Sequence, residues 1–113
     1  MAYDRALALR IHKALARRRG VTEKAMFGGL AFLLQGRMFC GIVGDELMVR
    51  VGPDAHAGAL ARRHVRPMDF TGRPMKGYVF VAAKGLRSAA ALARWVSAGA
   101  DFVARLGPKR RAR

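Results

Sequence analysis

The chain has 113 residues, the length of a single domain, and hydrophobic residues make up 52% of it. Twenty-two Lys and Arg against seven Asp and Glu give a net charge of +15 at pH 7, so we expect the protein to attract polyanions, nucleic acid first. We expect a cytoplasmic protein without a membrane span, because no apolar run approaches roughly 20 residues, no signal peptide is evident and the single cysteine has no internal partner.

The first predicted element is an amphipathic helix over residues 3–19. Its apolar residues follow the i, i+4, i+7, i+8 spacing of one buried stripe: Leu7, Ile11, Ala14 and Leu15. Gly20 is a natural C-terminal stop for this helix. Three basic residues line the flank of the stripe, either as a solvated face or as an anion-binding surface: Arg10, Lys13 and Arg17.

Three strands are predicted next, at Ala25–Leu34, Met38–Val43 and Leu47–Val51. The segments between them, at residues 35–37 and 44–46, are short enough to force antiparallel hairpins. The paired glycines at 28 and 29 lie inside the first run, where they indicate a bulge or a close approach of another backbone.

A short helix is predicted from Asp54 to about His64, because Gly52-Pro53 breaks the preceding strand. Residues 65–71 then form an extended segment, since Pro67 disfavours helix for the residue before it. A turn over residues 72–77 leads into a strand at Tyr78–Val81.

The last predicted element is the strongest helix, with Ser88 as its N-cap. Its apolar residues keep helical spacing over about four turns: Leu92, Trp95, Val96, Phe102, Val103 and Leu106. Gly99 falls on the same stripe, which is typical of close packing against a sheet. Gly107-Pro108 ends the helix, and Lys109–Arg113 forms a basic tail.

The predicted order is therefore α-β-β-β-α-β-β-α in one domain over residues 1–107, with residues 108–113 as the tail. This order predicts an α+β fold of two layers, with an antiparallel sheet and helices on one face. The other face of the sheet would be partly open, and a half-apolar open face is a common homodimer surface.

No catalytic centre, metal site or cofactor motif is evident. Cys40 lies in an apolar strand, where a thiol behaves as a small hydrophobe. His56 and His64 are about 12 Å apart along the predicted short helix, too far to share a metal ion. We therefore predict that the protein is not an enzyme and holds no cofactor.

The turn over residues 72–77 joins two strands, so it lacks the strand-to-helix transition of a nucleotide-binding loop. It forms either a fixed connection or, with its cations and a neighbouring arginine, an anion site. The candidate residues for binding an anion or a partner are Arg10, Lys13, Arg17, Arg66, Arg73 and Lys76.

Four segments together resemble the N-terminal domain of the TfoX/Sxy family of bacterial competence regulators: Met26–Leu30, Gly36–Phe39, Leu47–Gly52 and Phe70–Tyr78. The resemblance spans about residues 3–105 and implies a two-layer domain, similar in fold to secretion chaperones and often dimeric. Longer relatives carry a second domain and regulate DNA-uptake genes. The resemblance implies no catalytic residues.

Two functions follow as hypotheses. The first is a regulatory module that works through protein partners, self-associates through its open sheet face and takes part in the transcriptional control of competence. The second is direct nucleic-acid binding by the basic surface, including Arg10, Lys13, Arg17, Arg73, Lys76 and the tail. A small-molecule or enzymatic role is not favoured by any motif.

Overall fold

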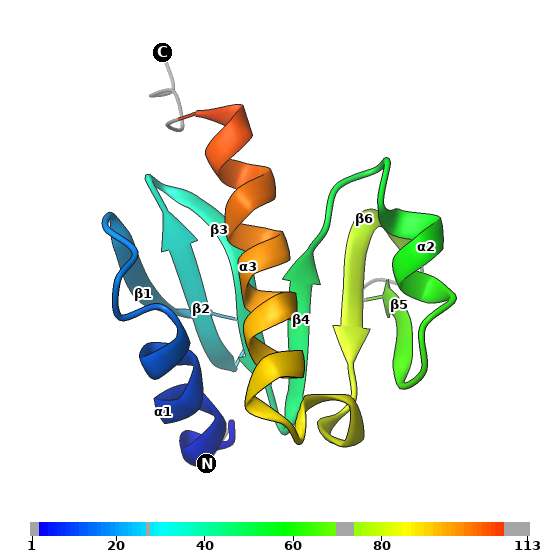
Figure 1. The fold of residues 1–113 in the computed structure, drawn as a ribbon, viewed down its shortest axis with the longest axis horizontal. Helices are drawn as coiled ribbons and strands as arrows, with labels where there is room; N and C mark the ends of the chain where they lie inside the picture. Colours follow the sequence, from blue (N-terminus) through cyan, green and yellow to red (C-terminus); the bar gives the residue numbers. More distant parts are fainter. Residues whose placement is uncertain (1–2, 27, 70–73, 108–113) are drawn as a thin grey trace.

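A computed structural model of the protein describes residues 3–26, 28–69 and 74–107. Its elements are α1 (Arg5–Ala14), β1 (Val21–Met26), β2 (Gly29–Leu34), β3 (Arg37–Val43), β4 (Glu46–Arg50), α2 (His56–Leu60), β5 (Val65–Asp69), β6 (Pro74–Val81), the 3₁₀ helix η1 (Ala83–Leu86) and α3 (Ala89–Leu106). The strands form one antiparallel sheet of six strands in the order β1-β2-β3-β4-β6-β5. Figure 1 shows α1, α2 and α3 on the same face of this sheet, which confirms the predicted α+β fold of two layers.

The sheet contains one strand more than expected. The predicted single strand over Ala25–Leu34 is wrong, because β1 and β2 form a hairpin in which Val21 pairs with Leu34 and Met26 pairs with Gly29. Gly28 has a φ of +71° at the connection, a conformation that glycine adopts without strain. At Gly29 the predicted close approach is confirmed, since a Cβ there would lie 1.9 Å from the carbonyl oxygen of Ile42.

Helix α1 is shorter than the predicted span of residues 3–19. Asp4 begins it, because its Oδ1 accepts hydrogen bonds from the backbone N–H groups of Ala6 (2.9 Å) and Leu7 (3.1 Å). After Ala14 the backbone changes to tighter i→i−3 hydrogen bonds, including Arg18 N to Leu15 O at 2.9 Å. The chain therefore leaves the helix before the run of arginines that precedes β1.

Two further boundaries differ from expectation. Strand β6 begins at Pro74, so residues 74–77 of the segment predicted as a turn are extended, and proline is tolerated as the first residue of a strand. Gly72 and Arg73, the first two residues of that segment, lie outside the described residues. Helix α2 ends at Leu60, and His64, expected at its end, has a φ of +67° outside any helix.

The main core lies between the helices and the sheet. Its largest fully buried side chains include Phe32, Phe39, Ile42 and Val49 from the strands, and α3 packs directly on β3 and β4. The predicted N-cap of α3 is confirmed, because Ser88 Oγ accepts a hydrogen bond from Ala91 N at 3.0 Å. The helix ends at Leu106, as expected from the glycine that follows it.

The opposite face of the sheet carries no helix in the described part of the chain, and we call it the helix-free face. Side-chain alternation in β4 directs Met48 to this face, because Leu47 and Val49 belong to the main core. Met48, Met68 and Phe80 are nevertheless buried, and partly buried neighbours such as Tyr78 pack around them. These residues form a second, smaller apolar cluster, and its side chains cover part of the helix-free face.

Candidate functional site

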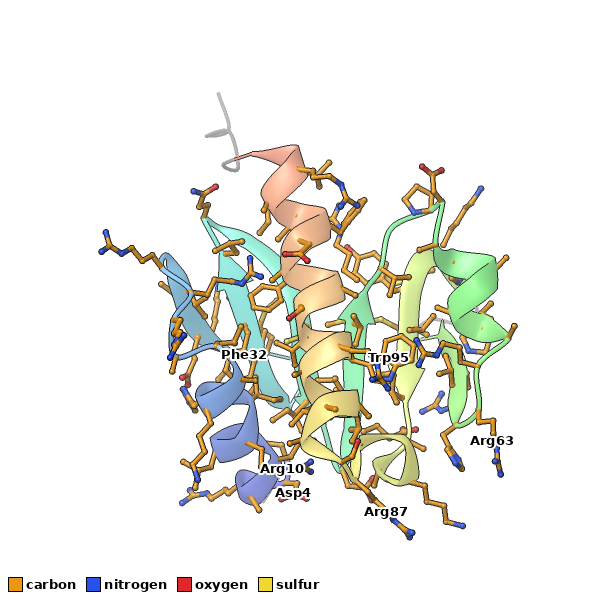
Figure 2. The ribbon with its side chains drawn as sticks, viewed as in Figure 1. Asp4, Arg10, Phe32, Arg63, Arg87 and Trp95 are labelled. Atoms are coloured by element: carbon orange, nitrogen blue, oxygen red, sulfur yellow. The ribbon has the colours of Figure 1, made fainter. Side chains whose placement is uncertain are left out.

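Arg10, predicted as an anion-binding residue, is held by the backbone of the protein. From α1 its Nη2 donates hydrogen bonds to the carbonyl oxygens of Leu86 (2.5 Å) and Arg87 (3.2 Å). Figure 2 shows Arg10 reaching from α1 toward the start of α3. Because the Arg10 guanidinium hydrogen-bonds to carbonyl groups at the end of η1, it holds α1 close to the start of α3. This side chain therefore has a structural role, which it performs through one of its three guanidinium nitrogens.

Lys13 and Arg17 are exposed and lie along a groove between α1 and α3. The groove consists of two adjoining hollows of about 240 Å³ and about 440 Å³ that share Ala14. Its basic lining residues are Arg10, Lys13, Arg17, Arg18 and Arg19, and its other lining residues are Ala14, Ala89, Leu92, Ala93 and Ser97. We call this the α1–α3 groove; no acidic side chain is among these lining residues.

Arg66 lies on the helix-free face, away from the α1–α3 groove. Its Nε and Nη2 donate hydrogen bonds to the two carboxylate oxygens of Glu46, at 3.0 and 2.5 Å. Its guanidinium also lies over the ring of Phe80, with Cζ 4.5 Å from the ring centroid. The Arg66 side chain therefore covers part of the second cluster. Its Nε and Nη2, the donor pair that would bind an external anion, are bonded to Glu46 instead.

The remaining predicted residues belong to the segment before β6 and to that strand. Lys76 is exposed on β6, whereas Arg73 lies outside the described residues. The structure therefore brings Arg10, Lys13 and Arg17 together along one groove and places Arg66 on the other side of the sheet.

A second groove, which the sequence did not reveal, lies between α2 and α3. Its volume is about 460 Å³, and its lining residues are Val51, Ala55, Gly58, Ala59, Arg62, Trp95, Ala98, Asp101 and Arg105. We call it the α2–α3 groove. Figure 2 shows Trp95 on the side of α3 that faces α2.

Arginines stack on aromatic rings along this groove. Arg62 lies over the indole of Trp95, with Cζ 4.8 Å from the centroid. Beside the groove, the Cζ atoms of Arg105 and Arg50 lie 5.9 and 5.3 Å from the centroid of the Phe102 ring. These are distances at which a guanidinium is attracted to the face of a ring.

One sequence signal pointed toward the α2–α3 groove. Trp95, Ala98, Phe102 and Arg105 follow one another at i, i+3, i+7 and i+10, and therefore share one side of α3. The stacking of Arg62 on Trp95 joins residues 33 positions apart, from two different elements. Local periodicity cannot predict such a contact.

The described titratable groups include one buried thiol and one His–Glu pair at the surface. Cys40 is fully buried, and burial raises the pKa of its thiol far above the usual range. His12 pairs with Glu23 at 2.6 Å on the surface, where both side chains are partly exposed. No group of three or more His, Cys, Asp or Glu in the described ranges is placed to hold a metal ion.

Comparison with known proteins identifies a family. The model of a family described as the TfoX N-terminal domain matches residues 13–103. This range runs from within α1 to within α3 and includes both grooves in large part. No curated protein and no solved structure gives a significant match to the chain. No helix among the described residues is long and apolar enough to cross a membrane.

Proposed function

Because this chain belongs to the TfoX N-terminal domain family, we propose that it is a non-enzymatic regulatory module that binds a protein partner in the cytoplasm and acts in the transcriptional control of competence. The observation that carries this proposal is the α2–α3 groove, whose lining combines an apolar floor with stacked arginines. Such a surface is suited to recognition, because aromatic and arginine side chains dominate the energetics of protein interfaces.

The proposal is tested in the bacterium that encodes the protein. Deletion of the gene should lower the transcript levels of DNA-uptake genes, and expression of the wild-type chain should restore them. Unchanged transcripts in the deletion strain, under conditions that induce competence, would contradict the regulatory role.

Self-association through the helix-free face forms part of the same proposal. Partly buried apolar side chains such as Met38, Val43 and Tyr78 surround the second cluster and offer the surface that a second copy would cover. Light scattering coupled to size exclusion should then give the mass of a dimer. A monomeric mass at all concentrations would contradict self-association. A dimeric mass that Val43→Glu leaves unchanged would contradict this particular contact.

Direct nucleic-acid binding is the second candidate function, and the α1–α3 groove favours it. Its basic side chains gather along one cleft with no acid among the lining residues, which suits a phosphate backbone. Arg18 of this lining is paired with Asp101, so Lys13, Arg17 and Arg19 are the residues proposed to contact phosphates. A mobility shift that keeps a sequence preference at physiological salt would establish this function, and binding lost at that salt would reject it.

A further inference from the structure

We infer that the α2–α3 groove binds an acidic segment of a protein partner, with one apolar side chain of that segment between the two helices and its carboxylates on Arg62 and Arg105. The inference rests on the proposed function, because it gives the chemistry of the partner that the module recognises. It follows from three features of the groove: its floor, its arginines and its single acid.

The exposed sides of the groove are made of small residues, and its floor is apolar. Ala55, Gly58 and Ala98 are the exposed small residues of the lining. The buried lining residues are Val51, Ala59 and Trp95. A Cβ added at Gly58 would meet no atom within 4 Å, so the space above this residue is open. The volume of about 460 Å³ lies within the range of roughly 300–1,000 Å³ that is usual for ligand pockets. An aliphatic or aromatic side chain therefore has room to enter.

Arg62 is already held in place, because its guanidinium lies 4.8 Å from the centroid of the Trp95 indole. Arg105 lies 5.9 Å from the centroid of the Phe102 ring, at the outer limit of such a contact. A guanidinium that stacks on a ring through its face leaves its N–H donors available, because they point outward in its own plane. This is the geometry in which an arginine binds a carboxylate with two hydrogen bonds. Within the described residues, neither arginine donates a hydrogen bond or forms an ion pair. Their donors are thus free for a ligand, and little rotamer entropy is lost on binding.

The charge pattern favours a peptide over a nucleic acid. Six of the nine lining residues are uncharged, and the three that are charged are Arg62, Asp101 and Arg105. Asp101 accepts a hydrogen bond from Arg18 Nη2 at 2.9 Å, so its charge is compensated by a residue of the α1–α3 groove. A continuous phosphate backbone would place its charges over the apolar floor as well as on the arginines. An acidic peptide fits better, because apolar and carboxylate side chains alternate within a few residues.

The net charge of +15 supports the same partner chemistry. A strongly basic protein attracts acidic surfaces over distances of several ångströms before contact, which raises the association rate. The apolar floor then supplies the short-range selection that net charge lacks.

The test uses the whole chain and a short fluorescein-labelled peptide in which one Leu is flanked on both sides by Glu. Trp95 is the only tryptophan of the protein, so its fluorescence reports directly on the groove, and anisotropy of the label reports on binding. We expect saturable binding that changes the Trp95 emission. Arg62→Ala and Arg105→Ala should each weaken it about tenfold or more, as expected for the loss of a charge-assisted pair.

Two matched controls separate the groove from general charge. Gly58→Leu fills the open space and should abolish binding, whereas Gly58→Ala keeps the fold and much of the space. Arg63→Ala removes the same charge as Arg62→Ala outside the groove lining and should leave affinity unchanged; Figure 2 shows Arg63 pointing away from α3.

Three outcomes would overturn the inference: no saturable binding of the peptide, binding that persists in Gly58→Leu, or equal binding of a peptide with Ser in place of Leu. Binding of single-stranded oligothymidylate that is lost in Arg62→Ala but kept in a Lys13→Ala, Arg17→Ala variant would instead assign the groove to nucleic acid. The proposed function fails separately, through unchanged DNA-uptake transcripts after gene deletion. Wild-type and Gly58→Leu chains that both restore those transcripts would reject the groove and leave the regulatory role standing.

Discussion

Gly99 of α3 lies directly against the backbone of β3, because a Cβ added at Gly99 would come within 2.4 Å of the carbonyl oxygen of Phe39. A backbone oxygen in a sheet cannot swing aside as a side chain does. The distance between α3 and the sheet is therefore set by the missing side chain, which offsets the cost of about 1 kcal/mol that glycine carries in a helix interior.

The first prediction concerns this contact. Gly99→Ala should lower the free energy of unfolding by about 1–3 kcal/mol, because the added methyl group forces α3 away from β3. Gly58→Ala is the matched control in a helix with open space, and it should be neutral or stabilising by up to about 1 kcal/mol. Urea denaturation of both variants measures the difference, and equal effects would show that the helix–sheet spacing adapts freely.

The second prediction concerns the start of α3. Ser88→Ala should destabilise the protein by about 1 kcal/mol, since it removes the hydroxyl that accepts from Ala91 N at 3.0 Å. Ser97→Ala, at an interior position of the same helix, should be neutral or slightly stabilising. Thermal and urea unfolding compare the two, and similar stability of both variants would reject the capping role.

The third prediction concerns pH. Burial raises the pKa of the Cys40 thiol in the folded state, so the unfolded chain loses this proton first as the pH rises. The contribution of Cys40 to stability is fully present below the unfolded pKa of about 8.5 and falls above it by about 1.4 kcal/mol per pH unit. The stability difference between wild type and Cys40→Ala should narrow accordingly between neutral and alkaline pH. A difference that is constant with pH would mean that the folded thiol also ionises.

The fourth prediction concerns the helix-free face. The Arg66 and Glu46 side chains are 54% and 25% exposed, so solvent screens their ion pair, and Glu46→Gln should cost less than about 1 kcal/mol. Arg66→Ala should cost more, because it also uncovers the ring of Phe80. Arg66→Met keeps most of the apolar cover and should fall between the two. A larger loss from Glu46→Gln than from Arg66→Ala, in urea denaturation, would contradict this ranking.

The fifth prediction concerns nucleic-acid binding through the α1–α3 groove. Replacing both Lys13 and Arg17 with Ala should reduce the slope of log affinity against log salt for duplex DNA by up to about 1.8, or about 0.9 for each lost phosphate contact. The control Arg63→Ala, Lys84→Ala removes the same net charge away from the groove. An equal reduction in the control would mean that affinity follows total charge alone.

Most of the sheet could be predicted from apolar runs and turn residues, but β1 could not. Its central residues Thr22, Glu23 and Lys24 are exposed at the edge of the sheet, so they lack the apolar alternation that marks a half-buried strand. The end of α1 at Ala14 could not be predicted either, because the residues that follow it have a helix-compatible pattern. The basic run at residues 17–19 is compatible with a helix, and the turn there is set by hydrogen bonds that periodicity does not contain.

The candidate site was predicted only where local spacing decides it. Lys13 and Arg17 share a helical flank, and they do lie along one groove. Arg10 shares the same flank, yet it donates to a carbonyl 76 residues away. The α2–α3 groove depends on the packing of two helices, with Arg62 and Trp95 brought together by the tertiary fold.

The hydrogen bond from Arg10 to Leu86 also bears on how the protein is made. It belongs to a contact between the first and last described helices, and α3 in turn covers β3 and β4. A chain still emerging from the ribosome has made all six strands before the helix that shields them. Phe39, Ile42 and Val49 therefore face water, and any chaperone at the exit site, until residues 89–106 are synthesised. We expect the core to close only after α3 has been made, when this helix docks onto β3 and β4.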